Sequence, residues 1–237
     1  MFFDPVYWLV IGIGLLLGFW AQARVKGTFA KYSRMPVRSG VTGAQVAEAI
    51  LRARGIREVR IVPVAGELTD HYDPRRKVLR LSQPVYGARS MAAAGVAAHE
   101  VGHAIQHAEG YWPLRFRSAW VPVANIGSGL SYVVIILALL LGGTATALGQ
   151  SLAVAGVALF ATTTVFTLVT LPVEFDASKR ALATLEQSGL IARDELDGAR
   201  RVLNAAALTY VAAFVTSLLT LLYWAWRLGL LGGGRRD

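Results

Sequence analysis

The stretch from Leu148 to Leu171 reads LGQSLAVAGVALFATTTVFTLVTL, and no Asp, Glu, Lys or Arg interrupts it. A helix needs about 20 consecutive, predominantly apolar residues to cross a bilayer, and this stretch is long enough. A helix buried in a soluble core is the alternative interpretation. The length of the uncharged stretch favours a membrane-spanning helix.

Three further stretches share this character, namely Pro5–Ala23, Val121–Gly142 and Ala205–Trp226. Charged residues make up 16% of the 237-residue chain, below the share of about 25% found in soluble domains. Four such stretches predict a polytopic membrane protein of the mainly α class. We expect one domain over residues 1–237, with transmembrane helices at about 5–23, 121–142, 148–171 and 205–226.

The first apolar stretch also resembles a secretory signal, because Ala21-Gln22-Ala23 has the small residues of a cleavage site. A secretory signal starts with positive charge, whereas Asp4 precedes this stretch and no Lys or Arg does. We therefore favour an uncleaved helix with its amino terminus outside the cell, and a cleaved signal is the alternative.

The formal net charge of +9 raises the question of nucleic-acid binding, but no predicted helix carries a basic stripe with interleaved aromatic residues. Of the 24 Lys and Arg residues, 16 lie between Arg24 and Arg117 and five between Lys179 and Arg201. Because positive residues collect in cytoplasmic loops, residues 24–120 and 172–204 are expected in the cytoplasm. The uncharged loop near Thr144 would be external, as would Arg235 and Arg236, which the same rule mildly disfavours.

The segment before the second apolar stretch has mixed patterns. Residues 43–54 have the spacing of a short amphipathic helix, with Thr42 as its cap. Residues 59–64 and 77–82 alternate like strands, and the turn at 73–76 makes a small β-hairpin plausible. Residues 77–82 are either an edge strand that pairs with an extended substrate or a strand that covers a helix.

A helix is predicted over residues 91–109, with Ser90 as its cap, and it contains His99-Glu100-Val101-Gly102-His103. Residues four apart share a helix face, so His99 and His103 can bind one Zn²⁺ ion. Glu100 can then act as general base toward a water molecule. Three of the four histidines lie within nine positions, which argues against a chance match; the absence of Cys excludes thiolate ligands.

A catalytic zinc site usually has three protein ligands and a water, so a third ligand is needed. His107 lies about 12 Å beyond His99 along the same helix, too far for a shared ion, and is expected to be a packed or supporting residue. His71 could approach from the hairpin, or it could be structural or contact the substrate.

Glu174 is the strongest candidate for the third ligand. It follows the third apolar stretch directly, and four crossings would place it on the same side of the membrane as His99. Asp176 is the next candidate, but it lies about 200° around a helix from Glu174, so both cannot face one ion. Ser178 shares a face with Glu174 and could hydrogen-bond to a ligand.

Four segments together resemble the bacterial YugP-type membrane zinc metallopeptidases: Thr69–Pro74 (TDHYDP), His99–His107 (HEVGHAIQH), Leu171–Ser178 (LPVEFDAS) and Val202–Tyr210 (VLNAAALTY). That family is distantly similar to HtpX-type and CAAX prenyl proteases, in which the glutamate of an E-x-x-A-D pattern is the third zinc ligand. Ser178 stands here where that Asp would. The resemblance implies a gluzincin-like, zincin-type helical catalytic region and a peptidase of the bacterial inner membrane.

The sequence thus predicts a membrane-embedded zinc endopeptidase with one Zn²⁺ ion on His99, His103 and Glu174, facing the cytoplasm. Its substrates would be peptides or membrane proteins, and no nucleic-acid partner is expected. The donor that stabilises the oxyanion is unassigned among His71, Tyr72 and Tyr210. A zinc-binding membrane scaffold without turnover is the alternative, but a structural site does not need Glu100.

Overall fold

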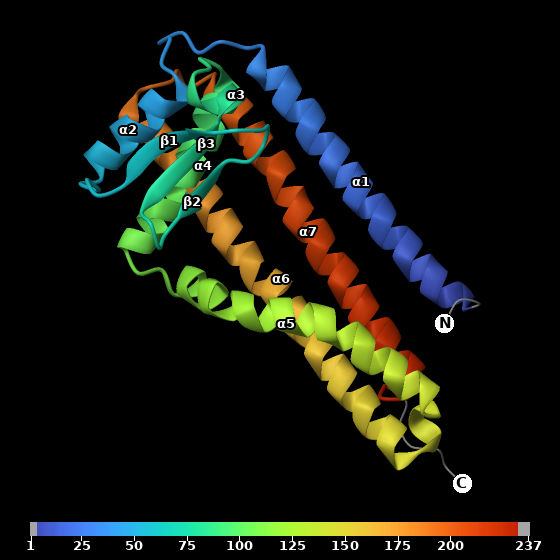
Figure 1. Ribbon diagram of the computed structural model, residues 1–237. Helices are drawn as coiled ribbons and strands as arrows, with labels where there is room; N and C mark the ends of the chain where they lie inside the picture. The colour runs from blue at the N-terminus through green and yellow to red at the C-terminus, as the bar shows by residue number, and fades with distance from the viewer. Residues whose placement is uncertain (1–3, 232–237) are drawn as a thin grey trace. The chain divides into compact units, whose positions relative to one another are not determined.

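The computed structural model describes residues 4–231, most of which are helical (Figure 1). The helices are α1 (Pro5–Ser33), α2 (Gly43–Ala53), α3 (Gln83–Tyr86), α4 (Met91–Ala108), α5 (Trp112–Leu140), α6 (Ala147–Ser188) and α7 (Leu196–Arg227), with a 3₁₀ turn at Gly143–Ala145. The strands are β1 (Arg60–Val64), β2 (His71–Asp73) and β3 (Val78–Ser82). Arg235 and Arg236, for which an external position is expected, lie outside the described residues.

The chain forms two compact units. The helical unit comprises the residues up to Trp20, Phe116–Leu171 and the residues from Tyr210 on. The site unit comprises Ala21–Arg115 and Pro172–Thr209. The boundaries fall within a few residues of the ends of the four uncharged stretches, so the division follows hydrophobicity along the chain.

Four described helices, α1, α5, α6 and α7, are long and apolar enough to cross a membrane, which confirms the predicted number. At most 28% of the most apolar window of each is buried within the protein. Their remaining apolar surface is therefore suited to contact lipid. Within the helical unit, α5 and α6 pack closely, since a Cβ at Gly127 would lie 2.7 Å from the carbonyl oxygen of Leu159.

Helix α6 has 42 residues and is about 63 Å long, roughly twice the thickness of a bilayer's hydrocarbon core. It therefore contributes residues to both units. Its final turns, after Leu171, extend beyond the predicted span and carry Glu174 into the site unit.

The described strands form one sheet in the order β1-β3-β2, in the site unit. Strand β2 pairs antiparallel with β3 in the predicted hairpin, whose turn is held by Asp73 Oδ1 accepting hydrogen bonds from the backbone N–H groups of Arg75 and Arg76. Strand β1 pairs in parallel with the other side of β3.

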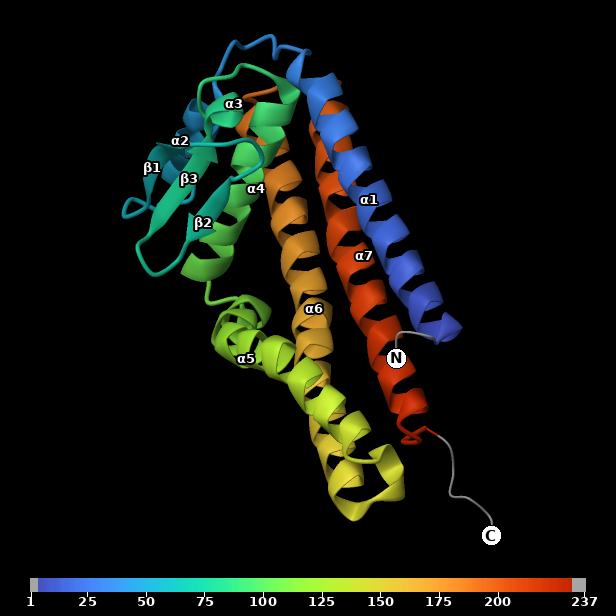
Figure 2. The same ribbon diagram turned by 45° about the vertical axis from the view of Figure 1, so that its right-hand side comes forward.

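Because β3 is the central strand, the first of the two interpretations of residues 77–82, an edge strand that pairs with substrate, is wrong. Both of its sides already pair with neighbouring strands, so its backbone is not open to a peptide. The alternative interpretation holds instead. Leu79 and Leu81 are fully buried, and the sheet covers α4 and α2 (Figures 1 and 2).

The ends of the shorter helices follow their capping residues. Thr42 and Gln45 form a reciprocal capping box at the start of α2, with Thr42 Oγ1 accepting from the Gln45 N–H at 3.2 Å. Ser90 Oγ accepts from the Ala93 N–H at the start of α4. The Thr42 cap sets where α2 begins, and the Ser90 cap sets where α4 begins.

Candidate metal centre

Helix α4 presents two imidazoles to one side, in the site unit. His99 and His103 are one turn apart, and their ring centroids are separated by 4.8 Å. The first half of α4 consists mainly of buried alanines. Their small side chains let neighbouring elements pack close to the helix that carries the histidines.

Helix α6 brings the acidic residue to these imidazoles. Glu174 is buried, and its Oε2 lies 3.3 Å from Nε2 of His99 and 3.5 Å from Nε2 of His103. The two helices can approach because residue 102 is glycine. A Cβ at Gly102 would lie 2.5 Å from the carbonyl oxygen of Ala177, far inside van der Waals contact.

One donor atom from each of these three residues lies within 4.8 Å of the others, so the group can hold a metal ion. Two imidazole nitrogens and a carboxylate oxygen form a ligand set that suits Zn²⁺ and that leaves a fourth position open. The structure thus brings together the three residues that the sequence predicted as a metal site.

Gln106 shows which nitrogen of His103 faces Glu174. Its Nε2 donates to the carbonyl oxygen of Val173 and to Asp176 Oδ2, each at 2.8 Å. Its Oε1 must then be the acceptor of the 3.0 Å hydrogen bond with His103 Nδ1. His103 therefore donates from Nδ1, which leaves Nε2 toward Glu174 with a lone pair in the neutral tautomer.

Ser178 has the equivalent position at the other imidazole. Its Oγ lies 3.1 Å from Nδ1 of His99 and can accept a hydrogen bond from it, so Nε2 again faces Glu174. With both imidazoles neutral, their Nε2 lone pairs would converge on the carboxylate, and a metal ion among them would offset the repulsion, as protonation of an imidazole also would. The donor set therefore fits a bound metal ion.

A network on α6 supports Gln106. Asp176 accepts from Gln106 and, at 2.5 Å, from Nε of Arg180, and Arg180 also pairs with Glu109. Asp176 thus contacts Gln106, the residue that orients His103. Asp176 itself is not one of the three residues that can hold the metal ion. Sequence reasoning missed Gln106, although its position three residues after His103, on the same helix face, was a signal that could have found it.

Glu100 is buried beside the metal group. Burial raises the pKa of its carboxyl above the ordinary value, although the neighbouring His99 and His103 act in the opposite direction. Burial by itself would lower the pKa of His103, but the contact with Glu174, the charge of Glu100 and the hydrogen bond with Gln106 together outweigh burial, so the pKa of His103 is raised. A buried carboxyl with a raised pKa has the character of a proton acceptor poised closer to neutral pH.

The other predicted candidates lie in different surroundings. Tyr72 donates or accepts in a 2.8 Å hydrogen bond with Nδ1 of His107, which joins β2 to the end of α4. His71 is exposed on β2, where its Nδ1 lies 2.8 Å from the carbonyl oxygen of Thr69. Tyr210 belongs to the helical unit, and its role stays a prediction.

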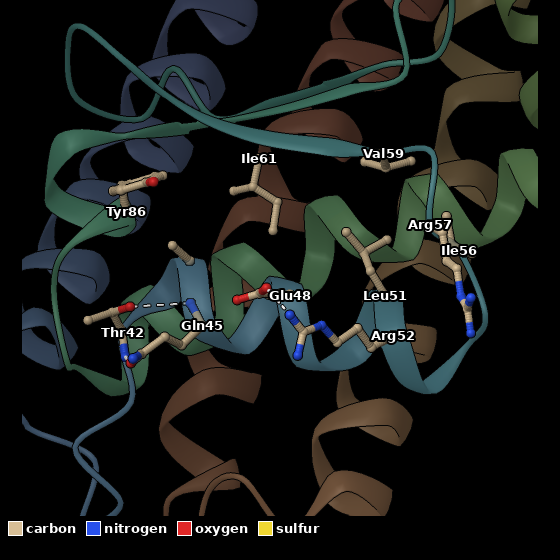
Figure 3. Close-up of a pocket in the computed structure, with 11 residues that line it drawn as sticks. Thr42, Gln45, Glu48, Leu51, Arg52, Ile56, Arg57, Val59, Ile61 and Tyr86 are labelled. Carbon is tan, nitrogen blue, oxygen red and sulfur yellow. Dashed lines mark hydrogen bonds and ion pairs between the residues drawn. The ribbon is translucent and has the colours of Figure 1, made fainter.

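A separate cavity of about 820 Å³ lies between α2, β1 and α3 (Figure 3). Leu51, Val59 and Ile61 give it an apolar lining, and the ion pair of Glu48 with Arg52 lies beside them (Figure 3). None of the three members of the metal group lines this cavity, so we do not assign the chemistry to it.

Residues 7–229 match the model of a protein family described as "Putative neutral zinc metallopeptidase". The chain is also 48% identical over 206 residues to the "Putative membrane protease YugP" of Bacillus subtilis (strain 168), covering 87% of this chain and 89% of that protein. The chain belongs to this zinc metallopeptidase family. No solved structure matches it.

Membership of the family confirms the predicted resemblance and the assignment of zinc as the cofactor. The metallopeptidase family, the membrane-protease relative and the four apolar helices together indicate a multi-pass membrane protease. The group of His99, His103 and Glu174 is the place in the described residues where such a cofactor fits.

Proposed function

We propose that this chain is a zinc-dependent endopeptidase of the bacterial inner membrane, with its site on the cytoplasmic side and a gluzincin-like HExxH arrangement. One observation carries the proposal. Donor atoms of His99, His103 and Glu174, from two separate helices, converge within 4.8 Å in a chain of a zinc metallopeptidase family.

In this proposal His99, His103 and Glu174 hold the zinc ion, and Ser178 and Gln106 orient the two imidazoles. Zinc at such a site supplies Lewis acidity, which activates water near neutral pH and polarises a carbonyl group. Glu100 takes a proton from the attacking water and delivers it to the nitrogen of the leaving amine. Burial of Glu100 supports this role, because it makes the carboxylate a stronger base.

The position of the site along the chain supports a substrate near the membrane. Glu174 lies three residues beyond Leu171, about 4.5 Å along α6 from the end of the uncharged stretch. Peptides or membrane-protein segments that emerge at the cytoplasmic border of the bilayer are the substrates that this position favours.

The test is Glu100→Gln, with zinc content and casein cleavage measured on the purified full chain. We expect zinc content to stay unchanged and cleavage to fall by about 10² to 10⁴-fold, as general-base catalysis is lost. Glu67→Gln, on an exposed loop residue, is the matched control and should cleave normally. Cleavage by Glu100→Gln at the wild-type rate would remove Glu100 as the general base. A wild type that binds zinc but does not cleave, together with unchanged cellular function of Glu100→Gln, would favour a zinc-binding scaffold without turnover.

A further inference from the structure

A cavity of about 530 Å³ lies between α1 and α7 within the site unit. The two helices run side by side in both views (Figures 1 and 2). The lining includes three cationic residues, Arg24, Lys31 and Arg201, and three apolar residues, Ala23, Ala205 and Leu208. The cavity thus combines positive charge with apolar surface in one place, away from the metal group.

Each helix contributes one face to this cavity. On α1 the lining residues Arg24, Gly27, Thr28 and Lys31 have the i, i+3, i+4, i+7 spacing of a single helix face. On α7 the residues Arg201, Asn204, Ala205 and Leu208 repeat that spacing. The two faces form one continuous surface rather than a chance hollow between loops.

The cavity lies at the ends of two uncharged stretches. The stretch in α1 ends at Ala23, directly before Arg24, and the stretch in α7 begins at Ala205, shortly after Arg201. Both ends mark the level at which a bilayer gives way to water. A pocket at this level has lipid headgroups and the upper parts of acyl chains as its neighbours.

Arg201 and Lys31 have N–H groups that can donate hydrogen bonds to an acceptor in the cavity. Arg201 donates from Nε to Asp197 Oδ2 at 2.7 Å, which orients its guanidinium and leaves the terminal N–H groups as further donors. Lys31 Nζ lies 5.3 Å from the centroid of the Tyr32 ring. The space beside Gly27 is open, because a Cβ placed there would meet no atom within 4 Å.

We propose that this cavity binds the headgroup of an anionic phospholipid. Arg24, Lys31 and Arg201 contact the phosphate, and the acyl chains extend beside Ala205 and Leu208. The positive charge of the cavity attracts any anion, but its apolar side favours a lipid, because only a lipid has acyl chains that can be buried against apolar residues.

The test uses the purified full chain in an uncharged detergent, with binding of dioleoylphosphatidylglycerol and dioleoylphosphatidylcholine measured by native mass spectrometry. We expect tighter binding of the anionic lipid by the wild type. The double variant Arg24→Gln/Lys31→Gln should weaken that binding by about 30-fold, equivalent to about 2 kcal/mol. Arg75→Gln/Arg76→Gln, an equal charge change on the exposed β2–β3 turn, should leave it unchanged.

A second variant, Gly27→Leu, fills the cavity without changing the charge. Leucine is the better helix former, so folding should not suffer, and binding of phosphatidylglycerol should fall about tenfold or more. The proposal is overturned if both lipids bind equally, if Gly27→Leu binds like the wild type, or if inorganic phosphate binds as tightly as the lipid.

Discussion

Gln106 orients one of the imidazoles that face Glu174, and it does so through hydrogen bonds alone. Both of its N–H groups are committed to oxygen acceptors, so its carbonyl oxygen receives the proton of His103 Nδ1. Neutral His103 then has its lone pair on Nε2, the nitrogen nearest Glu174. At the level of single residues, the site is thus prepared for a cation before one binds.

Replacing the acidic member of the group tests this arrangement directly. In Glu174→Ala, zinc content measured by elemental mass spectrometry should fall from about one ion per chain to less than a tenth of that, because two imidazoles remain. Glu186→Ala, an exposed residue farther along the same helix, is the control and should keep its zinc. Undiminished zinc in Glu174→Ala would remove Glu174 from the ligand set.

At the level of elements, the site depends on how closely α4 approaches α6. Gly102 stands between the two histidines in the sequence and faces the backbone of α6 at Ala177. In most helices a glycine weakens the element by about 1 kcal/mol relative to alanine. Here the missing side chain is what allows the carboxylate of Glu174 to reach both imidazoles.

An ordinary glycine-to-alanine change in a helix raises the unfolding free energy. Because of this contact, Gly102→Ala is predicted to lower it. The new methyl group would overlap the Ala177 carbonyl oxygen, so we expect a loss of about 1 to 3 kcal/mol in unfolding free energy, with weaker zinc binding. Thermal unfolding and zinc titration of the purified chain measure both effects.

Gly87→Ala is the matched control, because a Cβ at Gly87 meets no atom within 4 Å and its φ of −99° suits alanine. A Gly102→Ala protein as stable as this control, with normal zinc affinity, would contradict the close approach of α4 and α6.

At the level of the whole molecule, the four apolar helices and the charge distribution predict the orientation in the membrane. If all four helices cross, two crossings separate residues 24–120 from residues 172–204, so both ranges would lie on one side and the loop at Gly143–Ala145 on the other. The cationic residues in the first two ranges favour the cytoplasm for that side.

The chain has no cysteine, so single cysteines can report this orientation without background labelling. In intact cells, a membrane-impermeant maleimide should label Thr144→Cys and spare Arg75→Cys and Glu186→Cys. All three should react after the membrane is permeabilised, which controls for accessibility. Labelling of Arg75→Cys in intact cells would place the site unit outside the cytoplasm.

Much of this protein could be predicted from local patterns. The apolar stretches predicted four spanning helices, and the spacing of His99 and His103 predicted a shared helix face, because both depend only on neighbours along the chain. The capping of α2 by Thr42 and of α4 by Ser90 followed for the same reason. The position of Glu174 directly after the third apolar stretch made it the leading candidate for the third ligand, and the family resemblance added the peptidase.

Tertiary structure alone decided what depends on distant segments packing together. The order of the sheet put β3 in its centre, which pairing across the chain determines and the alternation of residues 77–82 does not. The meeting of Glu174 with the imidazoles, and the hydrogen bonds of Gln106 and Ser178, likewise required α6 to lie against Gly102. Hydrophobicity and helical spacing depend only on residues that are neighbours in the sequence. The metal group of His99, His103 and Glu174 forms only where α4 and α6 come into contact.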